Sequence, residues 1–283
     1  MSTIEAGRTD FPPSKTEKKK ISIFLPVYNE TERRTGDKPA GYYYEKTIAD
    51  YLSVLDNNFS RDEWNMSIVD DGSKTSDSAD LARKNGLRVI TYDTPGNRGR
   101  GAAYQKGFLE LSKSAQVIGA YDADGSYPPA TIIDHYEAIE AGHDMAISFR
   151  PNSIDQNDGI LRAAAHGILR TAREKLAYTG LKDTQAGAFA VSDQAAEYLF
   201  DRPDIMSGWA ANHQIARIAV LSGMQIAQIE QTIEPRGDSR VGGGILQLMK
   251  SGGQMIADSY AIGKEYSPKS QLNKSWVEFT ASY

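Results

Sequence analysis

Apolar runs of strand length alternate with stretches of helical periodicity along the first half of the chain. Ile48, Tyr51, Leu52 and Leu55, for example, fall at i, i+3, i+4 and i+7, on one face of a helix. The other predicted helices here are Ser76–Asn85, Gly101–Ser112 and Ile132–Glu140, and the predicted strands are Ile21–Leu25, Met66–Val69, Leu87–Tyr92, Val117–Tyr121 and Met145–Phe149. Strands separated by helices at this spacing predict an α/β fold with a mostly parallel sheet flanked by helices.

The second half of the chain is predicted to be more helical. Its predicted helices are Ile160–Tyr178, Gln194–Phe200, Asn212–Ser222 and Leu246–Ile262, and its predicted strands are Gly187–Val191 and Met224–Ile233. No linker or repeat divides the chain, so we expect a single domain at residues 20–263, between a polar arm at 1–19 and a tail at 264–283. Trp276, Val277 and Phe279 of the tail are expected to dock on the domain or on a second copy of the chain, forming a homo-oligomer.

Composition narrows the classes of function. The 32 Lys and Arg against 37 Asp and Glu give a net charge of −5, which argues against a nucleic-acid partner. The chain has no cysteine, so disulfides, thiolate zinc sites and cysteine nucleophiles are excluded. No apolar run approaches the ~20 residues of a membrane span, and the first residues lack the apolar core of a secretory signal. We therefore expect a cytoplasmic protein.

Polar segments rich in Asp and Gly follow the first four predicted strands. They are Pro26–Glu30, Asp70–Ser73, Gly96–Gly101 and Asp122–Ser126. Ligands bind at the carboxyl ends of the strands in such sheets. There, a carboxylate can accept a hydrogen bond from a base or ribose, glycines that open a helix can admit a phosphate, and paired carboxylates can hold a hard divalent cation. Each segment alone can be a turn, but four at successive strand ends are hard to explain as turns.

The order of these motifs resembles a known enzyme family. Pro-x-Tyr-Asn-Glu, Asp-Asp-Gly-Ser, Asn-x-Gly-x-Gly and Asp-x-Asp occur in this order in the GT-A nucleotide-sugar glycosyltransferases of family 2. The segments Asp122–Pro129, Ser148–Arg150 and Asp183–Gly187 are most similar to those of the polyprenol-phosphate (dolichol-phosphate) mannosyl- and glucosyltransferases. The resemblance implies a GT-A fold and a metal-dependent enzyme that moves one sugar from a UDP- or GDP-linked donor, with inversion.

The resemblance also implies roles for individual residues. The residues that it implies for binding the nucleotide sugar are Pro26, Tyr28, Glu30, Asp71, Asn97, Gly99, Asp122, Gln185, Arg236 and Arg240. At the metal, Mg²⁺ or Mn²⁺, it implies Asp124 as chief ligand, with Asp122 beside it. Asp183 would lie near the transferred sugar or acceptor, and we expect Asp122 and Asp183 to be catalytic. Arg150 and Arg162 match arginines that bind an acceptor phosphate, and His166 lies one helical turn after Arg162, where it could add a donor.

Two departures from the family pattern bear on the acceptor. Ser126 stands where the lipid-phosphate enzymes have a metal-binding Gln. Asn212, His213 and Gln214 stand where many relatives carry Asp-x-Glu, so a carboxylate base is not evident. A phosphate acceptor is already anionic and needs no base, which favours a polyprenyl phosphate met at the inner face of a membrane.

Three alternatives remain. His213 could be the base for a soluble hydroxyl acceptor, such as an antibiotic, glycan or small metabolite, although a lone helical His is more often structural. A catalytically silent sugar-nucleotide binding protein is the second. A nucleotidyltransferase would carry a Gly-x-Gly-Thr-Arg-like loop after the first strand, where this chain has Pro26–Glu30. The insert Thr31–Tyr44 is expected to be an exposed loop, or else to contact the acceptor.

Overall fold

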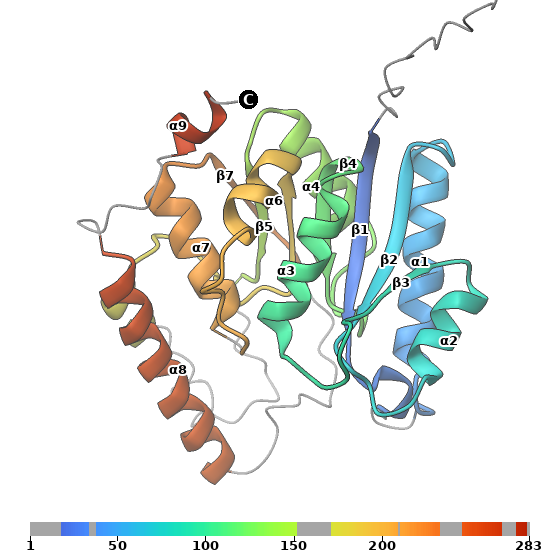
Figure 1. Ribbon diagram of the computed structural model, residues 1–283, viewed down its shortest axis with the longest axis horizontal. Helices are drawn as coiled ribbons and strands as arrows, with labels where there is room; N and C mark the ends of the chain where they lie inside the picture. Colours follow the sequence, from blue (N-terminus) through green and yellow to red (C-terminus); the bar gives the residue numbers. More distant parts are fainter. Residues whose placement is uncertain are drawn as a thin grey trace, which may run out of the picture.

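A seven-stranded sheet forms the centre of the computed structural model, which describes residues 18–33, 38–151, 171–208, 210–232, 245–267 and 276–281. The strands are β1 (Lys19–Val27), β2 (Trp64–Asp70), β3 (Arg88–Ile90), β4 (Ala115–Tyr121), β5 (Met145–Phe149), β6 (Ala188–Ser192) and β7 (Ile226–Glu230). Their order is β3-β2-β1-β4-β6-β5-β7 (Figure 1). Strand β6 pairs antiparallel with β4 and β5, and the other pairs are parallel, so the expected mostly parallel sheet is confirmed.

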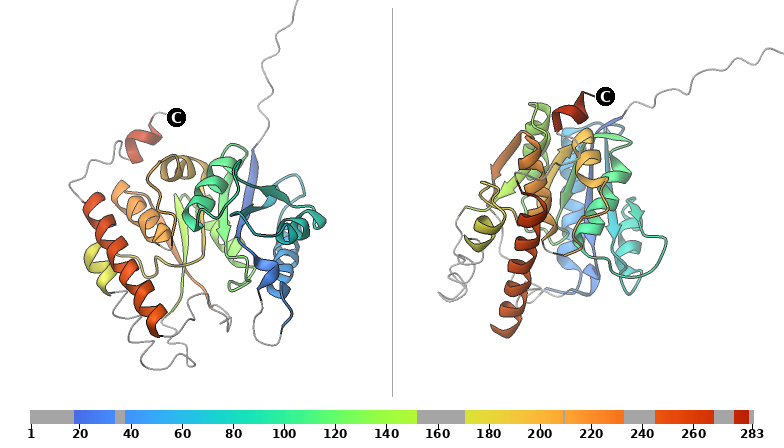
Figure 2. Two further views of the ribbon diagram at one scale, coloured as in Figure 1. Left: turned by 60° about the horizontal axis from the view of Figure 1, so that its bottom comes forward. Right: turned by 60° about the vertical axis from the view of Figure 1, so that its left-hand side comes forward.

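Helices cover both faces of this sheet. The structure describes η1 (Glu30–Glu32), α1 (Tyr42–Asn58), α2 (Asp77–Lys84), α3 (Arg100–Leu111), α4 (Thr131–Glu140), α6 (Asp193–Phe200), α7 (Ala211–Ser222), α8 (Ile245–Glu265) and α9 (Trp276–Thr280). Helix α3 packs on β1 and β4 beside α6 and α7, while α1 and α4 pack together on the other face. Figure 2 shows α8 running beside α7 along one side of the body.

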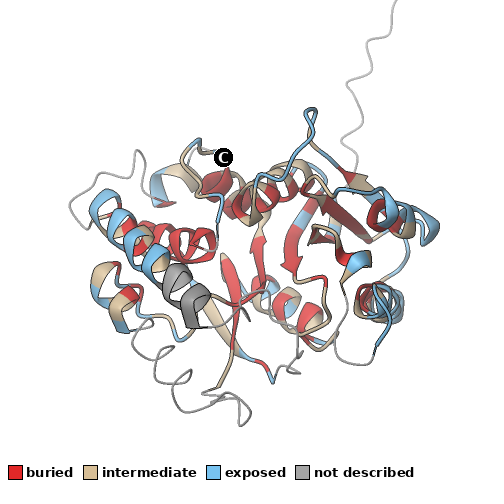
Figure 3. Ribbon diagram, turned by 90° about the horizontal axis from the view of Figure 1, so that it is seen from below, coloured by how far each residue is buried: buried red, intermediate tan, exposed pale blue. Residues whose placement is uncertain are grey.

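The apolar runs form strands because both of their faces are covered. Ile21, Ile23 and Leu25 of β1 are completely buried. On one face, the Phe24 ring meets Phe108 of α3 edge to face, with centroids 5.0 Å apart. Figure 3, seen from below, shows buried residues concentrated in the central strands.

The insert after β1 differs from the expected loop. Helix α1 begins at Tyr42, so the three tyrosines at its start are helical. Tyr44 is buried, and its hydroxyl donates to the backbone oxygen of Ser78, 3.0 Å away. The apolar face of α1 continues into this turn, and for this reason the helix starts earlier than Ile48 suggests.

The tail docks on the body of the same chain. Trp276 and Phe279 of α9 pack on Tyr198 of α6, with ring centroids 5.5 and 5.2 Å from that of Tyr198. At the other end, Lys19 of the expected arm already belongs to β1, and residues 1–17 lie outside the described residues. Within the described part of the chain, no helix is long and apolar enough to cross a membrane.

His135 of α4 is a fully buried polar link between the sheet and α4. Its ring nitrogens lie 3.2 Å from the Tyr121 hydroxyl and 3.0 Å from the Ser148 hydroxyl. Burial lowers the pKa of His135 from 6.5 to about 3. Between these two pH values the unfolded chain binds a proton that the folded chain does not. The contribution of His135 to stability is therefore lost as the pH falls from about 6.5 toward 3.

We expect His135→Gln to flatten the acid limb of the stability profile. Removing the imidazole removes up to one proton of difference between the states, or about 1.4 kcal/mol per pH unit. The variant should also lose about 1–3 kcal/mol at pH 7, because the Tyr121 and Ser148 hydroxyls lose an ideally placed partner. Urea unfolding at several pH values between 4 and 7 measures both effects. Equal slopes in the two proteins would show that His135 is not the group that titrates on unfolding.

Candidate active site

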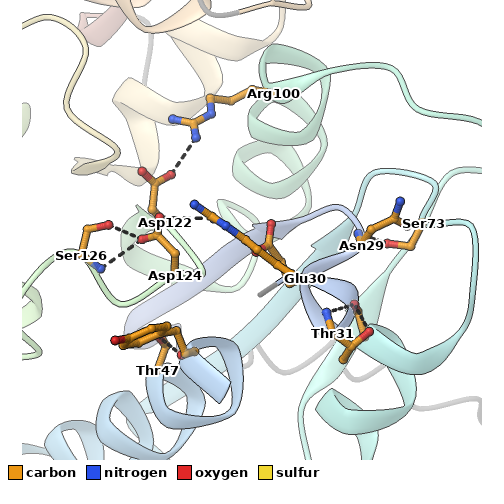
Figure 4. A network of polar contacts seen from close by, with 12 residues as sticks. Asn29, Glu30, Thr31, Thr47, Ser73, Arg100, Asp122, Asp124 and Ser126 are labelled. Atoms are coloured by element: carbon orange, nitrogen blue, oxygen red, sulfur yellow. Dashed lines mark hydrogen bonds and ion pairs between the residues drawn. The ribbon is translucent and has the colours of Figure 1, made fainter. Parts of the chain in front are cut away.

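The ends of β1 and β2 are tied together at the carboxyl edge of the sheet. Asn29 has a left-handed backbone (φ 54°), which its short polar side chain tolerates. Its backbone N–H donates to Ser73 Oγ (2.9 Å), and its Oδ1 accepts from the Lys74 N–H (2.8 Å). The turn carries Glu30 into a buried position (Figure 4). Pro26, the last residue but one of β1, pairs in register with Val69 of β2.

Asp71 holds the glycine-rich loop that precedes α3. Its carboxylate accepts from Asn97 Nδ2 (2.9 Å) and from the backbone N–H groups of Arg98 and Gly99 (2.8 Å each). Burial raises the pKa of Asp71, although the bonds from Arg98 and Gly99 oppose this shift. The structure therefore brings together three residues that the sequence assigned to the nucleotide, Asp71, Asn97 and Gly99. Contact of the Asp71 carboxylate with a nucleobase stays a prediction.

Asp122 is held between Arg100 and Gly187. The guanidinium of Arg100, the first residue of α3, lies 3.0 Å from Asp122 Oδ1 (Figure 4). The Asp122 N–H donates to the Gly187 carbonyl (2.9 Å), and an added Cβ on Gly187 would lie 1.8 Å from Asp122 Oδ2. Burial, with smaller contributions from the neighbouring Asp124 and Glu30 charges, raises the pKa of Asp122 to about 6, against the opposing effect of Arg100.

Asp124 follows on the same loop and faces the end of β1. Its Oδ1 accepts from the Ser126 N–H (3.0 Å) and contacts the Ser126 hydroxyl. Its Oδ2 lies 3.4 Å from Nη1 of Arg33, which also lies 3.5 Å from Glu30 Oε2. No three acidic or histidine side chains in the described residues are grouped as a complete metal site. Two oxygen-ligand carboxylates nevertheless suit Mg²⁺ or Mn²⁺, because such ions commonly take their remaining ligands from substrate phosphates and water.

A second acidic group lies next to this loop. Arg150, directly after β5, forms a two-pronged ion pair with Asp183: Nε lies 2.6 Å from Oδ2 and Nη2 lies 3.2 Å from Oδ1. Asp183 Oδ1 also accepts from the Gln185 N–H (2.9 Å). The hydroxyl of Tyr127, the residue after the Asp122–Ser126 loop, accepts from the Gly187 N–H (2.9 Å) and so connects this loop to the Asp183–Gly187 segment.

The side chains of residues 212–214 form hydrogen bonds with other residues of the chain. Asn212 Nδ2 donates to the Ala186 carbonyl (2.7 Å), and Gln214 Nε2 donates to the Asp204 carbonyl (2.8 Å). His213 is 1% exposed, and its Nδ1 lies 2.9 Å from the Thr184 hydroxyl. Burial lowers the pKa of His213 to about 4, so the ring is neutral at pH 7. This enclosed position gives no support to His213 as a catalytic base and favours a structural role.

Four site residues expected from the sequence, Arg162, His166, Arg236 and Arg240, lie outside the described residues. The structure in turn adds Arg33 and Arg100, which the sequence did not assign to the site. Arg100 could have been assigned to the site from the sequence, because it lies within the glycine-rich segment Gly96–Gly101. Arg33 had no such signal, because nothing in the insert marks which of its two arginines turns back toward Asp124.

Comparison with known proteins agrees with this arrangement. The family model "Glycosyl transferase family 2" matches residues 22–200. The chain belongs to this family, and it is a glycosyltransferase. Because the family shows the reaction class, the alternative of a nucleotidyltransferase is set aside.

The curated relatives include enzymes that act on lipid phosphates. The chain is 26% identical over 248 residues to a dolichyl-phosphate beta-glucosyltransferase of Trichomonas vaginalis, covering 82% of this chain and 68% of the relative. It is 25% identical over 247 residues to the polyprenol monophosphomannose synthase of Mycolicibacterium smegmatis, covering 84% and 87%. The expected resemblance to polyprenol-phosphate sugar transferases is confirmed.

Solved structures share the fold at low sequence identity. Glucosyl-3-phosphoglycerate synthase of Mycobacterium tuberculosis, solved with Mn²⁺, UDP and glucosyl-3-phosphoglycerate, superposes with a TM-score of 0.64 at 18% identity, covering 87% of this chain and 80% of that one. Mannosyl-3-phosphoglycerate synthase of Rubrobacter xylanophilus gives 0.63 at 16% identity, covering 90% and 77%. The GT-A fold expected for this chain is therefore confirmed.

Proposed function

We propose that this glycosyltransferase moves a sugar from a UDP- or GDP-linked donor to a phosphate-bearing acceptor, such as a polyprenyl phosphate met at a membrane surface. The names of the two curated relatives, which transfer glucose or mannose to lipid phosphates, support this acceptor class. The glycine loop held by Asp71 supports binding of a nucleoside diphosphate, because its backbone lies at the start of α3, where a helix favours negative charge.

Asp124, with Asp122, is the pair that would hold a divalent cation, Mg²⁺ or Mn²⁺. Both side chains lie on the loop after β4, and their oxygens suit a hard cation. When bound, the ion neutralises charge that develops on the leaving diphosphate. The glucosyl-3-phosphoglycerate synthase with the same fold holds Mn²⁺ and UDP, which is compatible with this assignment.

One observation carries the choice of acceptor: residues 212–214 supply no carboxylate, and their side chains are buried within the protein. Asn212 and Gln214 donate to carbonyls, and His213 is enclosed against Thr184. A hydroxyl acceptor must lose a proton and would need a base there. A phosphate oxygen attacks the anomeric carbon without one. In a single displacement, this oxygen forms the new bond as the bond from the anomeric carbon to the leaving phosphate oxygen breaks, and the configuration inverts.

Arg150 is the acceptor residue that the described part of the chain supplies. Its guanidinium lies on the same edge as Asp122 and donates two of its five N–H groups to Asp183, so it retains donors for an incoming phosphate. The carboxylates of Asp183 and Asp122 are both paired with arginines, which makes neither a good nucleophile for a double displacement. Arg150 and Asp183 therefore act together in orienting the acceptor.

A matched pair of acceptors tests the proposal. The protein is incubated with UDP-glucose or GDP-mannose and Mn²⁺, together with either a polyprenyl phosphate or the polyprenol of the same length in detergent. We expect glycolipid product from the phosphate alone. Arg150→Gln should raise the acceptor KM by about tenfold or more while changing donor KM little. Faster transfer to the polyprenol, or to a soluble sugar or polyol, would overturn the phosphate assignment.

A further inference from the structure

Three arginines pair with four acidic residues at the carboxyl edge, and one of the three arginines is held differently. Arg100 and Arg150 approach Asp122 and Asp183 to 3.0 and 2.6 Å, at ordinary hydrogen-bond distances. Arg33 lies 3.4 Å from Asp124 and 3.5 Å from Glu30, so a single Nη1 is shared between two carboxylates. Charge-assisted hydrogen bonds are strongest at about 2.7–2.9 Å. Arg33 therefore balances charge at Asp124 without being tightly bound to it.

The backbone brings Arg33 to this place. Its N–H donates to the Glu30 carbonyl (3.2 Å), which ends η1, and its carbonyl accepts from the Gly41 N–H (2.9 Å), which closes the base of the insert. Gly41 has a positive φ of 78°, and an added Cβ would lie 3.2 Å from Thr31 Cα. These hydrogen bonds fix the backbone of Arg33, and its side chain is thereby directed toward Asp124 rather than into solvent.

Burial explains why a cation is needed there in the absence of ligand. The side chains of Glu30, Asp124 and Arg33 are 8%, 19% and 18% exposed. Two carboxylates so far from water repel each other and lose hydration, and a positive charge between them offsets both costs. A divalent cation at Asp124 would also supply positive charge there. The ion and the Arg33 guanidinium are therefore alternatives for one position.

We propose that Arg33 is an internal counter-ion of Asp124 that competes with the divalent cation and yields when cation and nucleoside diphosphate arrive together. The inference rests on the proposed function, in which Asp124 holds the cation. In the protein without donor, Arg33 keeps the affinity for the bare ion low. When the diphosphate is present, its negative charge offsets the repulsion between ion and guanidinium. Arg33 is thus a positioning residue that couples metal binding to donor binding.

The test measures binding of Mn²⁺ alone, with no nucleotide present. Free Mn²⁺ is followed by electron paramagnetic resonance during titration of the whole protein and of Arg33→Gln, Arg33→Lys and Arg88→Gln. Arg88 pairs with Glu110 at an exposed position, so its variant removes the same charge far from Asp124. Melting curves confirm that each variant is folded. We expect Arg33→Gln to bind Mn²⁺ about tenfold tighter, and Arg33→Lys and Arg88→Gln to resemble the parent.

The outcomes separate this inference from the proposed function. Equal or weaker Mn²⁺ binding by Arg33→Gln overturns the inference, as does an absence of binding by all four proteins at millimolar Mn²⁺. An equal gain in Arg88→Gln would assign the effect to net charge and also overturn it. Tighter binding by Arg33→Gln alone supports it. If the parent then transfers no sugar in the acceptor assay, the proposed function fails while the counter-ion role of Arg33 stands.

Discussion

Replacing Asp124 with Asn is expected to lower sugar-nucleotide turnover by at least about 100-fold while leaving the fold intact. Asn keeps the shape of the side chain and an oxygen that can accept from the Ser126 N–H, so the loop after β4 should be retained. What disappears is the negative charge that would hold a divalent cation beside the leaving diphosphate. Release of nucleoside diphosphate from UDP-glucose and GDP-mannose in the presence of Mn²⁺ measures the loss.

The matched control is Asp193→Asn. Asp193 pairs with Lys18 (2.7 Å) at a partly exposed position at the start of α6, so this change removes one carboxylate away from the site. We expect its turnover to resemble that of the parent. Retained activity in Asp124→Asn would contradict a role of the metal in the proposed mechanism. An unchanged rate of the parent in excess EDTA would contradict it equally.

The order of strands and helices along the first half of the chain follows directly from the sequence. Runs such as Ile21–Leu25 and Val117–Tyr121 are mostly apolar and buried because helices cover both faces, and periodicity locates those helices to within a few residues. The reversed direction of β6 was not predicted. A buried strand has the same apolar pattern in either direction, so only pairing with β4 and β5 reveals it.

The candidate site, like the fold, could be predicted only in part from the sequence. Motif order placed Asp71, Asn97 and Gly99 at one site, and the structure brings them into hydrogen-bond contact. A motif does not reveal which groups a side chain hydrogen-bonds with. The Asp71 carboxylate holds a loop, and His213 is enclosed, because long-range packing decides both and leaves no local signal.

The insert Thr31–Tyr44 shows most clearly what the sequence alone does not predict. From composition it resembles an exposed polar loop, yet Tyr44 is buried and Arg33 reaches Asp124. Both contacts join residues far apart in the chain: the Tyr44 hydroxyl binds Ser78, and Arg33 binds a residue after β4. The first pair depends on how α1 and α2 dock, and the second on how the ends of β1 and β4 lie together, neither of which single-sequence patterns specify.

Gly187→Ala is expected to cause a large loss of turnover by displacing the Asp122 carboxylate. The new methyl group would lie 1.8 Å from Asp122 Oδ2 and 2.2 Å from its Cγ, far inside van der Waals contact. Asp122 must then move from its position at Arg100, and the buried segment must shift with it. We expect at least about 100-fold slower turnover, with a loss of about 1–3 kcal/mol in stability from overpacking. Nucleoside diphosphate release and urea unfolding measure the two effects.

A double-mutant cycle identifies the clash as the cause. If Asp122 is the group that the methyl displaces, Gly187→Ala should cost less stability in an Asp122→Ala background, where the space is open, although activity stays lost. Gly253→Ala is the control for adding a methyl group: its Cβ would meet nothing within 4 Å in the middle of α8, where Ala is a better helix former than Gly. That variant should be as active as the parent and about 1 kcal/mol more stable. An additive cycle, with the same stability cost in both backgrounds, would place the strain of Gly187→Ala elsewhere than on Asp122.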